Sequence, residues 1–282
     1  MKRTNISAII VIHNEEKFVR KCLSSIKDIC EEIIIMHDGK CTDNSLVIAS
    51  EFTDKVFESK RYGSPESHLV DGLYLSQHDW ILRLDTDEHL SDELIVHIRK
   101  LDLAQTQFTH FKASWRSWRG SGILVQSPYL QKILIFNKNH SFSIGIPHQA
   151  VSCSGKSLLL NGYLEHTPDH VNYGFFELVS KKLKPLAKFD AKMRLSSPLK
   201  IYPSHAVSLN PKRNILRNKH PLLTMPVFAC NTYVRSLWQL KTARNYFVFK
   251  TIFIFSHGHL VYQILLSYYL FLEKRRIVYA KE

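Results

Sequence analysis

Three short, almost wholly apolar runs, each ending abruptly in polar residues, constrain this chain more than any other feature. They cover residues 7–12, 32–36 and 79–84. Runs of this length are typical of strands that are buried on both faces of a parallel sheet. Between them, apolar residues recur three or four positions apart, which predicts helices. We therefore predict an α/β fold with a mostly parallel sheet.

The polar residues that follow these runs predict one binding crevice. They are residues 13–16, 37–44 and 85–88. In open α/β sheets, ligands bind beyond the carboxyl ends of the strands. We therefore expect the three clusters to meet at the same edge of the sheet.

The strongest chemical signal is the acidic set Asp85, Asp87 and Glu88. Two carboxylates one residue apart can share a hard divalent cation, which prefers oxygen ligands and keeps coordination positions for phosphate oxygens. Such a cation neutralises charge that develops on a departing diphosphate. The same spacing also occurs in acidic turns that simply open a helix, but the buried strand before it favours the metal site.

Several other classes of protein are excluded. Apolar residues make up 45% of the chain, which is enough for a core and excludes wholesale disorder. The sequence has no Gly-rich P-loop, and its Gly120-x-Gly122 does not follow a strand as a dinucleotide-binding motif would. Five scattered cysteines indicate neither a structural zinc site nor a disulfide scaffold. A bound nucleotide must therefore be held by carboxylates and a metal ion.

The segments IIVIHNEEKFVRKCLSSI, EIIIMHDGKCTDNSLVIA and DWILRLDTDEHLSDEL, in this order, resemble family 2 glycosyltransferases of the GT-A fold, in particular bacterial lipopolysaccharide and capsule-type members. In that family the first strand typically ends in Asn-Glu-Glu, the second in Asp-Gly with a Thr-Asp after it, and the third in Asp-x-Asp. The resemblance covers about residues 5–100 and weakens over 130–195. It implies a Rossmann-like, mostly parallel central sheet flanked by helices. It also implies transfer of a sugar from a nucleotide-sugar donor, with inversion.

The resemblance assigns a donor pocket to the first two polar clusters. Nucleotide-lining roles fall on His13, Asn14 and Glu15. Asp38 corresponds to the aspartate that accepts an N–H of the base. Asp43 either shapes this loop or caps the next helix. A UDP-sugar is the first choice of donor, although the residues around Asp38 depart from the family pattern and leave the nucleotide open.

The resemblance also assigns the metal ion and two further donor contacts. Asp85 and Asp87 would hold Mg²⁺ or Mn²⁺ against the diphosphate, which gives Asp87 a catalytic role. Glu66 and His68 either face the donor or form an exposed start of a helix.

Two later histidines and the general base have more than one candidate role or residue. Residues 147–151 resemble a Val-His-Glu element of the family, so His148 is a candidate third metal ligand, and His166 is a candidate phosphate or metal contact. The acceptor hydroxyl must lose a proton, but the position after His148 is Gln149, which cannot act as a base. Glu165 and Asp169 are the candidate bases nearest in sequence. The alternative is a non-catalytic sugar-nucleotide-binding or scaffold protein.

The excess positive charge lies in the last third of the chain. Residues 178–282 contain 19 basic and 3 acidic residues, whereas the whole chain carries +13. We predict a catalytic domain over 1–195 and a basic, helical extension over 196–282, with residues 196–226 as an irregular linker. Apolar stretches at 246–255 and 260–272 are each too short to span a bilayer. They form either a buried helical pair or helices in the membrane interface.

These features predict where the protein works. The N-terminus lacks the apolar core of a signal peptide, and the basic extension suits an anionic membrane surface. No nucleic-acid-binding module is recognisable. We expect a cytoplasmic protein at the inner face of the membrane, which acts on a saccharide or lipid-linked acceptor.

Overall fold

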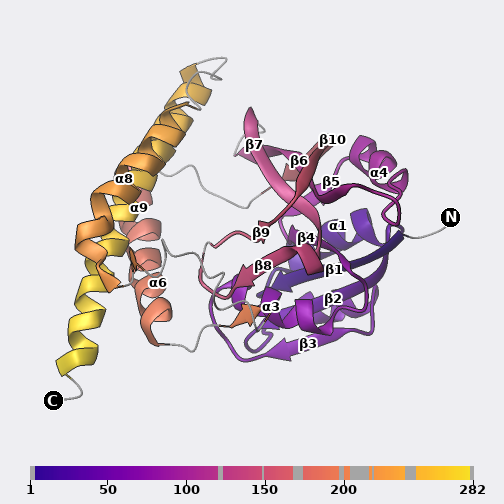
Figure 1. Ribbon diagram of the computed structural model, residues 1–282, viewed down its shortest axis with the longest axis horizontal. Coiled ribbons are helices and arrows are strands. Elements are labelled where there is room, and N and C mark those ends of the chain that lie inside the picture. The colour runs from indigo at the N-terminus through magenta and orange to yellow at the C-terminus, as the bar shows by residue number, and fades with distance from the viewer. Residues whose placement is uncertain are drawn as a thin grey trace. The chain divides into compact units, whose positions relative to one another are not determined.

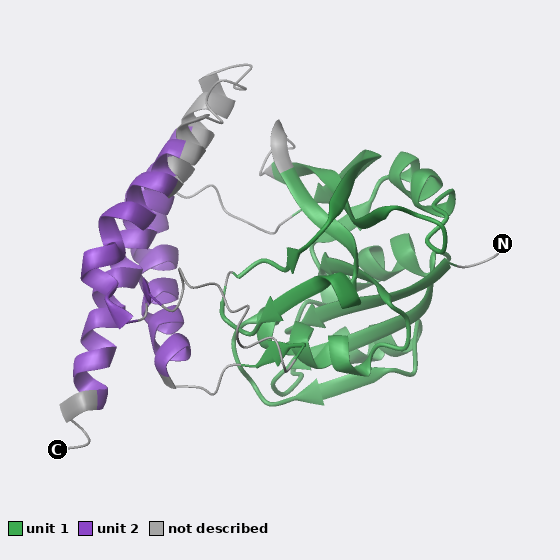
Figure 2. Cartoon of the chain, viewed as in Figure 1, with its two compact units in different colours: residues 1–170, 200–206 green, residues 171–199, 207–282 purple. Residues whose placement is uncertain are grey.

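The computed structural model describes residues 4–119, 123–147, 149–167, 174–196, 200–203, 216–217, 219–238 and 246–279. Figure 1 labels its elements. Two compact units divide the chain (Figure 2): residues 1–170 with 200–206, and residues 171–199 with 207–282. Neither unit is one continuous stretch of sequence.

An eight-stranded sheet forms the first unit, in the order β3-β2-β1-β4-β7-β6-β10-β5. Parallel pairing joins β1, β2, β3 and β4, and also joins β6 to β10, while β7 and β5 run antiparallel to their neighbours. The strands are β1 (Thr4–Ile12), β2 (Cys30–Asp38), β3 (Val56–Ser59), β4 (Trp80–Asp85), β5 (Glu88–Leu90), β6 (Phe108–Arg119), β7 (Ile123–Asn137) and β10 (Lys156–His166). The predicted α/β class with a largely parallel sheet is confirmed.

Helices cover both faces of this sheet, which explains why its strands read as continuous apolar runs. On β1, alternate residues Ile6, Ala8, Ile10 and Ile12 join one large core, while Ile9 joins a smaller core on the other face. The large core includes residues of α1 (Glu16–Ile26), α2 (Ser45–Ser50) and α4 (Asp92–Arg99). The smaller core includes Leu69 and Leu73 of α3 (Pro65–Leu75).

A small second sheet completes the first unit with a strand from late in the chain. It is ordered β11-β8-β9, with β8 (Ser141–Ile144), β9 (Ser152–Cys153) and β11 (Ile201–Tyr202). Just before β11, Lys200 pairs with Asp71 of α3, and its ammonium lies 4.4 Å from the ring centre of Tyr62. The first unit is therefore completed by residues that follow the first helices of the second unit.

The second unit is helical. It contains α5 (Phe175–Glu177), the π-helical segment η2 (Leu178–Leu183), α6 (Lys184–Ser196), α8 (Pro221–Trp238) and α9 (Tyr246–Tyr279). Ala187 and Ala191 of α6 pack against Leu266 and Leu270 of α9. Buried polar groups also cross this unit: the Tyr262 hydroxyl donates to Asp190. Arg217 donates to Gln263 and Ser267.

The structure places Trp115 and Trp118 on β6. Two expectations about elements are wrong. The two apolar stretches of the tail form one continuous helix, α9, rather than a pair. The expected linker over 196–226 includes β11 and the first turns of α8, which contains Pro226.

The two compact units also differ from the boundary we expected at 195/196. Residues 171–199 group with the C-terminal helices, because α6 packs on α9. The assignment of catalysis and membrane attachment to separate domains stays a prediction. None of the described helices has both the length and the apolarity needed to cross a bilayer.

Candidate active site

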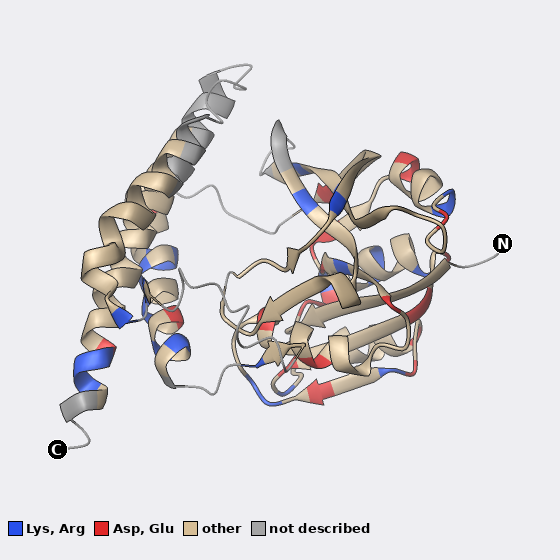
Figure 3. Cartoon of the chain, in the orientation of Figure 1, with Lys and Arg blue, Asp and Glu red and all other residues tan. Residues whose placement is uncertain are grey.

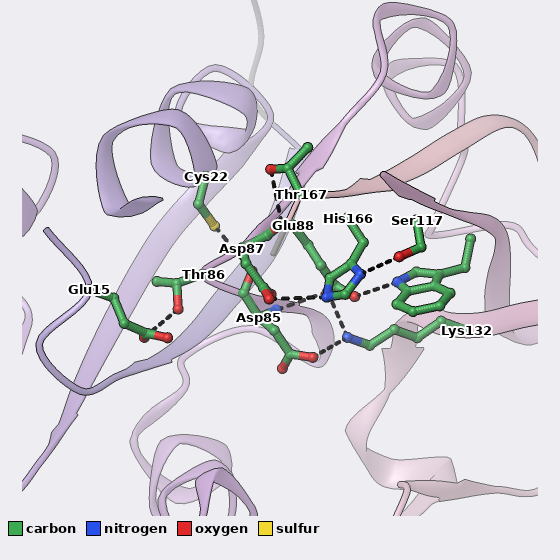
Figure 4. Close-up of polar contacts among 11 residues, drawn as sticks. Glu15, Cys22, Asp85, Thr86, Asp87, Glu88, Ser117, Lys132, His166 and Thr167 are labelled. Atoms are coloured by element: carbon green, nitrogen blue, oxygen red, sulfur yellow. Dashed lines mark hydrogen bonds and ion pairs between the residues drawn. The ribbon is translucent and has the colours of Figure 1, made fainter. Parts of the chain in front are cut away.

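The register of the sheet brings the three polar clusters to one edge. Val11 of β1 pairs with Asp85 of β4, and Ile12 pairs with His37 of β2. The loops that follow these strands therefore begin side by side, because parallel strands end at the same edge. The carboxylates of the first and third clusters lie together there (Figure 4).

Asp85 is paired with a lysine from the middle of the sheet. The Nζ of Lys132, on β7, donates to Asp85 Oδ2 at 2.7 Å. Arg83 lies further away, with its Nη2 3.7 Å from Asp85 Oδ1. Partial burial acts to raise the pKa of Asp85, but Lys132 and Arg83 hold it below its usual range. Asp85 is therefore ionised across the physiological range, with 46% of its side chain exposed.

Glu88 contacts both Asp85 and Lys132 from a buried position. Its side chain is only 2% exposed. Its Oε2 accepts from Lys132 Nζ at 2.6 Å and from the backbone N–H of Asp85 at 2.9 Å. Its Oε1 accepts from the indole N–H of Trp115 at 2.9 Å. Burial, and then the nearby Asp85 charge, raise the pKa of Glu88. Glu88 thus positions the groups around it rather than facing solvent.

Asp87 contacts a histidine held in a defined orientation. His166 Nε2 lies 3.0 Å from Asp87 Oδ2, while its Nδ1 lies 3.0 Å from the Ser117 hydroxyl. The Trp115 ring stacks on the imidazole at 4.5 Å between ring centres. The backbone N–H of Thr167 donates to the Asp87 carbonyl at 2.8 Å. These contacts fasten the acidic turn to the end of β10, and they bring together two predicted site residues, Asp87 and His166.

Glu15 joins the acidic cluster from the loop after β1. Its carboxylate accepts from the hydroxyl of Thr86 and from the backbone N–H of His13. Burial raises the pKa of Glu15, and the charges of Asp87 and Asp85 raise it further. The first polar cluster therefore does reach the acidic turn, as we expected.

Asn14 joins the first and second polar clusters. Its φ of 54° is left-handed, a conformation that asparagine adopts more readily than most residues. Its backbone N–H donates to His37 Nε2 at 3.3 Å, and its Oδ1 accepts from the N–H of Thr42 at 2.8 Å. Asp43 accepts from the backbone N–H of Ser45 at 2.9 Å. Both residues therefore help to fix the conformations of the loops after β1 and β2.

Asp38 is buried at the carboxyl end of β2 and is already hydrogen-bonded within the chain. Its Oδ1 accepts from Tyr62 N–H at 2.5 Å and lies 2.8 Å from His68 Nε2. Its Oδ2 accepts from Gly63 N–H at 2.8 Å. His68 is fully buried, so the idea that it begins an exposed helix is wrong. Asp38 and His68 thus form one hydrogen-bonded unit at the carboxyl end of β2.

The structure also places the other predicted residues. Glu66 is buried in the first turn of α3 and accepts from Ser64 Oγ at 2.6 Å, so it too is not exposed. Glu165 accepts from Trp118 Nε1 at 2.7 Å and pairs with Arg116 at 3.0 Å. Because neighbouring strand residues point to opposite faces, these contacts put Glu165 on the face opposite His166. His148 and Asp169 lie outside the described residues.

Sequence reasoning missed Lys132, Ser117 and the role of Trp115. Lys132 is a charged residue at the start of an apolar strand run, Lys132-Ile-Leu-Ile-Phe136, which is an available signal. Its partners on β4 and β5 depend on strand order and register, which the sequence pattern does not encode.

Asp85 and Asp87 fit a divalent cation that binds together with a phosphate-bearing ligand. Among the described residues, no three His, Cys, Asp or Glu side chains form a preformed cation site. Asp85 and Asp87 nevertheless keep 46% and 25% of their side chains exposed. Mg²⁺ is commonly held by one or two carboxylates together with substrate phosphates. Two open carboxylates at a strand end are suited to that mode of binding.

Comparisons with known proteins agree on one family. The sequence profile described as Glycosyl transferase family 2 matches residues 7–155. A Rickettsia bellii protein named an uncharacterised glycosyltransferase is 32% identical over 102 residues, which is 36% of this chain and 34% of that protein. The glycosyltransferase SunS of Bacillus subtilis is 28% identical over 89 residues, 31% of this chain and 21% of SunS. The match thus spans about a third or less of these relatives.

Comparison of backbone structures also identifies a similar solved structure. Staphylococcus aureus TarS 1–349 in complex with UDP-GlcNAc has a TM-score of 0.47 and 13% identity, with 92% of each chain covered.

Proposed function

The chain belongs to glycosyl transferase family 2 and is a glycosyltransferase, and from this premise we propose that it moves a sugar from a nucleotide-sugar donor to an acceptor hydroxyl in a metal-dependent reaction. The observation that carries this proposal is the meeting of Glu15, Asp85 and Asp87 at the carboxyl edge of β1 and β4. That edge is where open α/β sheets bind nucleotides. A UDP-sugar is the first donor to test.

The donor's nucleoside would lie over the first two loops. Asp38, held by His68 and two backbone N–H groups, would accept an N–H of the base with a remaining lone pair. Asn14 and His13 would line the ribose side of the pocket. The rigid hydrogen bonding of Asp38 supports this role, because a fixed acceptor costs little entropy when the base binds.

The diphosphate would meet Asp85 and Asp87. These carboxylates would hold Mg²⁺ or Mn²⁺, which would neutralise charge on the leaving nucleoside diphosphate. Glu88 would keep Asp85 in place by accepting from its backbone N–H, and His166 would keep Asp87 in place through their hydrogen bond. His148 remains part of this proposal as a third ligand.

A direct displacement at the anomeric carbon would invert its configuration and requires a base for the acceptor hydroxyl. Of the two carboxylates predicted for this step, Glu165 is engaged by Trp118 and Arg116 on the opposite face of the sheet. We therefore propose Asp169 as the base.

We propose that the acceptor is a surface glycan or a lipid-linked saccharide, and that the second unit binds an anionic membrane surface at the cytoplasmic side. Two observations support membrane binding. Exposed apolar side chains occur along α8 and α9, including Leu223 and Val227 on α8 and Tyr268 and Leu272 on α9. Exposed Lys274, Arg275 and Arg276 lie near the C-terminal end of α9, where Figure 3 shows Lys and Arg gathered.

The metal and donor assignment is tested at Asp87. The full chain is incubated with a panel of nucleotide sugars and Mn²⁺, and release of nucleoside diphosphate is measured. Asp87→Ala should lower this rate by about a hundredfold or more, since a metal ligand contributes several kcal/mol to the transition state. Chelation with EDTA should abolish turnover, and added Mn²⁺ or Mg²⁺ should restore it.

The matched control is Asp54→Asn, which removes one exposed carboxylate away from the site. It should leave turnover unchanged. Full activity in Asp87→Ala would refute the site. Donor binding without turnover in the unsubstituted protein would instead favour a non-catalytic binding protein.

A further inference from the structure

Lys132 places a positive charge beside Asp85 and Glu88. None of the roles that the family resemblance implies includes this lysine. It lies on β7, between β4 and β6 in the sheet, and 23% of its side chain is exposed. Its ammonium contacts Asp85 Oδ2 at 2.7 Å and Glu88 Oε2 at 2.6 Å (Figure 4). The lysine therefore bridges one open carboxylate and one buried carboxylate.

These two partners differ in how firmly they are held. Glu88 is almost fully buried and also receives hydrogen bonds from Trp115 and from the Asp85 backbone. The Asp85 side chain is about half exposed. A lysine ammonium has three donors on a flexible stem. It can therefore stay on Glu88 while it exchanges its second partner.

A divalent cation on Asp85 would compete with this ammonium. Both cations need the Asp85 carboxylate, and at such short range they repel each other. A diphosphate changes this balance, because its oxygens accept charge-assisted hydrogen bonds from an ammonium. The metal ion would therefore displace the Lys132 ammonium from Asp85, and the diphosphate would offer that ammonium a new acceptor.

We propose that Lys132 is an exchangeable cation of the donor site. Without donor it neutralises Asp85. When a divalent cation and a nucleoside diphosphate bind together, its ammonium leaves Asp85, stays on Glu88 and donates to a diphosphate oxygen. The proposal rests on the proposed function, because it assumes a diphosphate donor at Asp85 and Asp87. It predicts that Lys132 weakens the binding of metal alone and strengthens the binding of diphosphate.

The test measures two affinities in the full chain by calorimetry, with Mn²⁺ alone and with UDP in the presence of saturating Mn²⁺. Lys132→Met should bind Mn²⁺ about tenfold more tightly and UDP about tenfold more weakly than the unsubstituted protein, a size typical of coupling between neighbouring sites. Lys132→Gln, which keeps a hydrogen-bond donor for Glu88, should shift both affinities in the same directions. This second variant decides the matter if Lys132→Met does not fold.

Lys112→Met is the matched control. Lys112 lies on the neighbouring strand β6, where its backbone pairs with Ile133, and it is half-buried. The substitution removes the same charge and should leave both affinities unchanged. Thermal melting of each variant checks the fold.

The opposite shifts separate this role from a structural one, because a distorted site would weaken both ligands. If folded Lys132 variants bind Mn²⁺ as the unsubstituted protein does, or bind both ligands more weakly, the exchange is refuted while the proposed function stands. If the unsubstituted protein binds no UDP even with Mn²⁺, the proposed function fails, and the role of Lys132 fails with it.

Discussion

Asp38 illustrates how single residues hold this site in a charged state. Burial acts to raise its pKa, but the hydrogen bonds from His68 and from the Tyr62 N–H lower it below the ordinary value of 3.8. The lowered pKa stabilises the folded state at every pH at which Asp38 is ionised in the folded protein. This stability is fully present above the unfolded pKa and is lost as the pH falls through the lower folded pKa.

We therefore predict a pH-dependent effect of Asp38→Asn. At pH 7 the amide cannot accept all three hydrogen bonds, and an unpaired buried group should cost about 1–3 kcal/mol in the free energy of unfolding. The difference from the unsubstituted protein should shrink as the pH falls below about 4, because Asp38 becomes protonated first in the unfolded chain and only at lower pH in the folded one. Urea denaturation at a series of pH values measures this. Asp54→Asn serves as control, and a difference that stays constant with pH would contradict the explanation.

At this scale the sequence predicts acids better than their partners. Asp85, Asp87 and Asp38 could be identified because each follows a recognisable buried strand. Lys132 and Ser117 could not, since each is distant in sequence from its partner and meets it only through the order of β4, β7, β6 and β10. Glu165 was chosen by sequence proximity, and its contacts are decided by the face of β10 on which it lies.

Among the elements, β10 has a local geometry that requires glycine at one position. Its register with β6 shifts between Leu159 and Tyr163, and Gly162 within this shift has a φ of +97°. A Cβ on Gly162 would lie 2.4 Å from the backbone N of Leu94 in α4. The strand can therefore approach α4 only with glycine here, and this approach precedes the segment that ends in His166.

Gly162→Ala should consequently lower the free energy of unfolding by about 3 kcal/mol, from backbone strain and overpacking together. Chemical denaturation of the full chain measures the loss. Gly174→Ala is the comparison, because nothing lies within 4 Å of its added Cβ. That variant should stay within about 0.5 kcal/mol. Equal stability of the two variants would show that β10 can shift away from α4.

The sequence predicts an element well when one apolar pattern runs through it. It predicts poorly an element whose continuity depends on packing against a distant segment. The apolar runs of β1, β2 and β4 were found within a few residues of their ends. The Ser-His-Gly-His interruption of the tail, by contrast, suggested two stretches. Gly258 costs about 1 kcal/mol in a helix, but an added Cβ there would meet Leu178 at 3.0 Å. Close packing with η2 thus accounts for glycine inside a continuous α9.

Across the whole molecule, charge is divided more sharply than the total of +13 suggests. Residues 178–282 carry 19 basic and 3 acidic residues, whereas the acidic turn and most other carboxylates belong to the first unit. Membrane attraction would therefore act through the second unit, while the proposed cation would bind the carboxylates of the first unit.

Replacing Lys274, Arg275 and Arg276 with Gln should weaken binding to vesicles rich in phosphatidylglycerol by about a hundredfold, at about 1 kcal/mol for each charge. Sedimentation with vesicles measures this, and added salt should reduce the difference. The control replaces Lys27, Lys40 and Lys60, three exposed lysines of the first unit, with Gln. If both triple variants bind alike, the attraction does not depend on the end of α9.

The late strand β11 makes the order of synthesis matter. Residues 200–206 complete the first unit, although residues 171–199 before them belong to the second. On the ribosome, the first unit must therefore wait for part of the helical unit to be translated before its small sheet can close. A single recombination breakpoint cannot exchange one unit between related enzymes without also cutting the other, so the two units are expected to be inherited together.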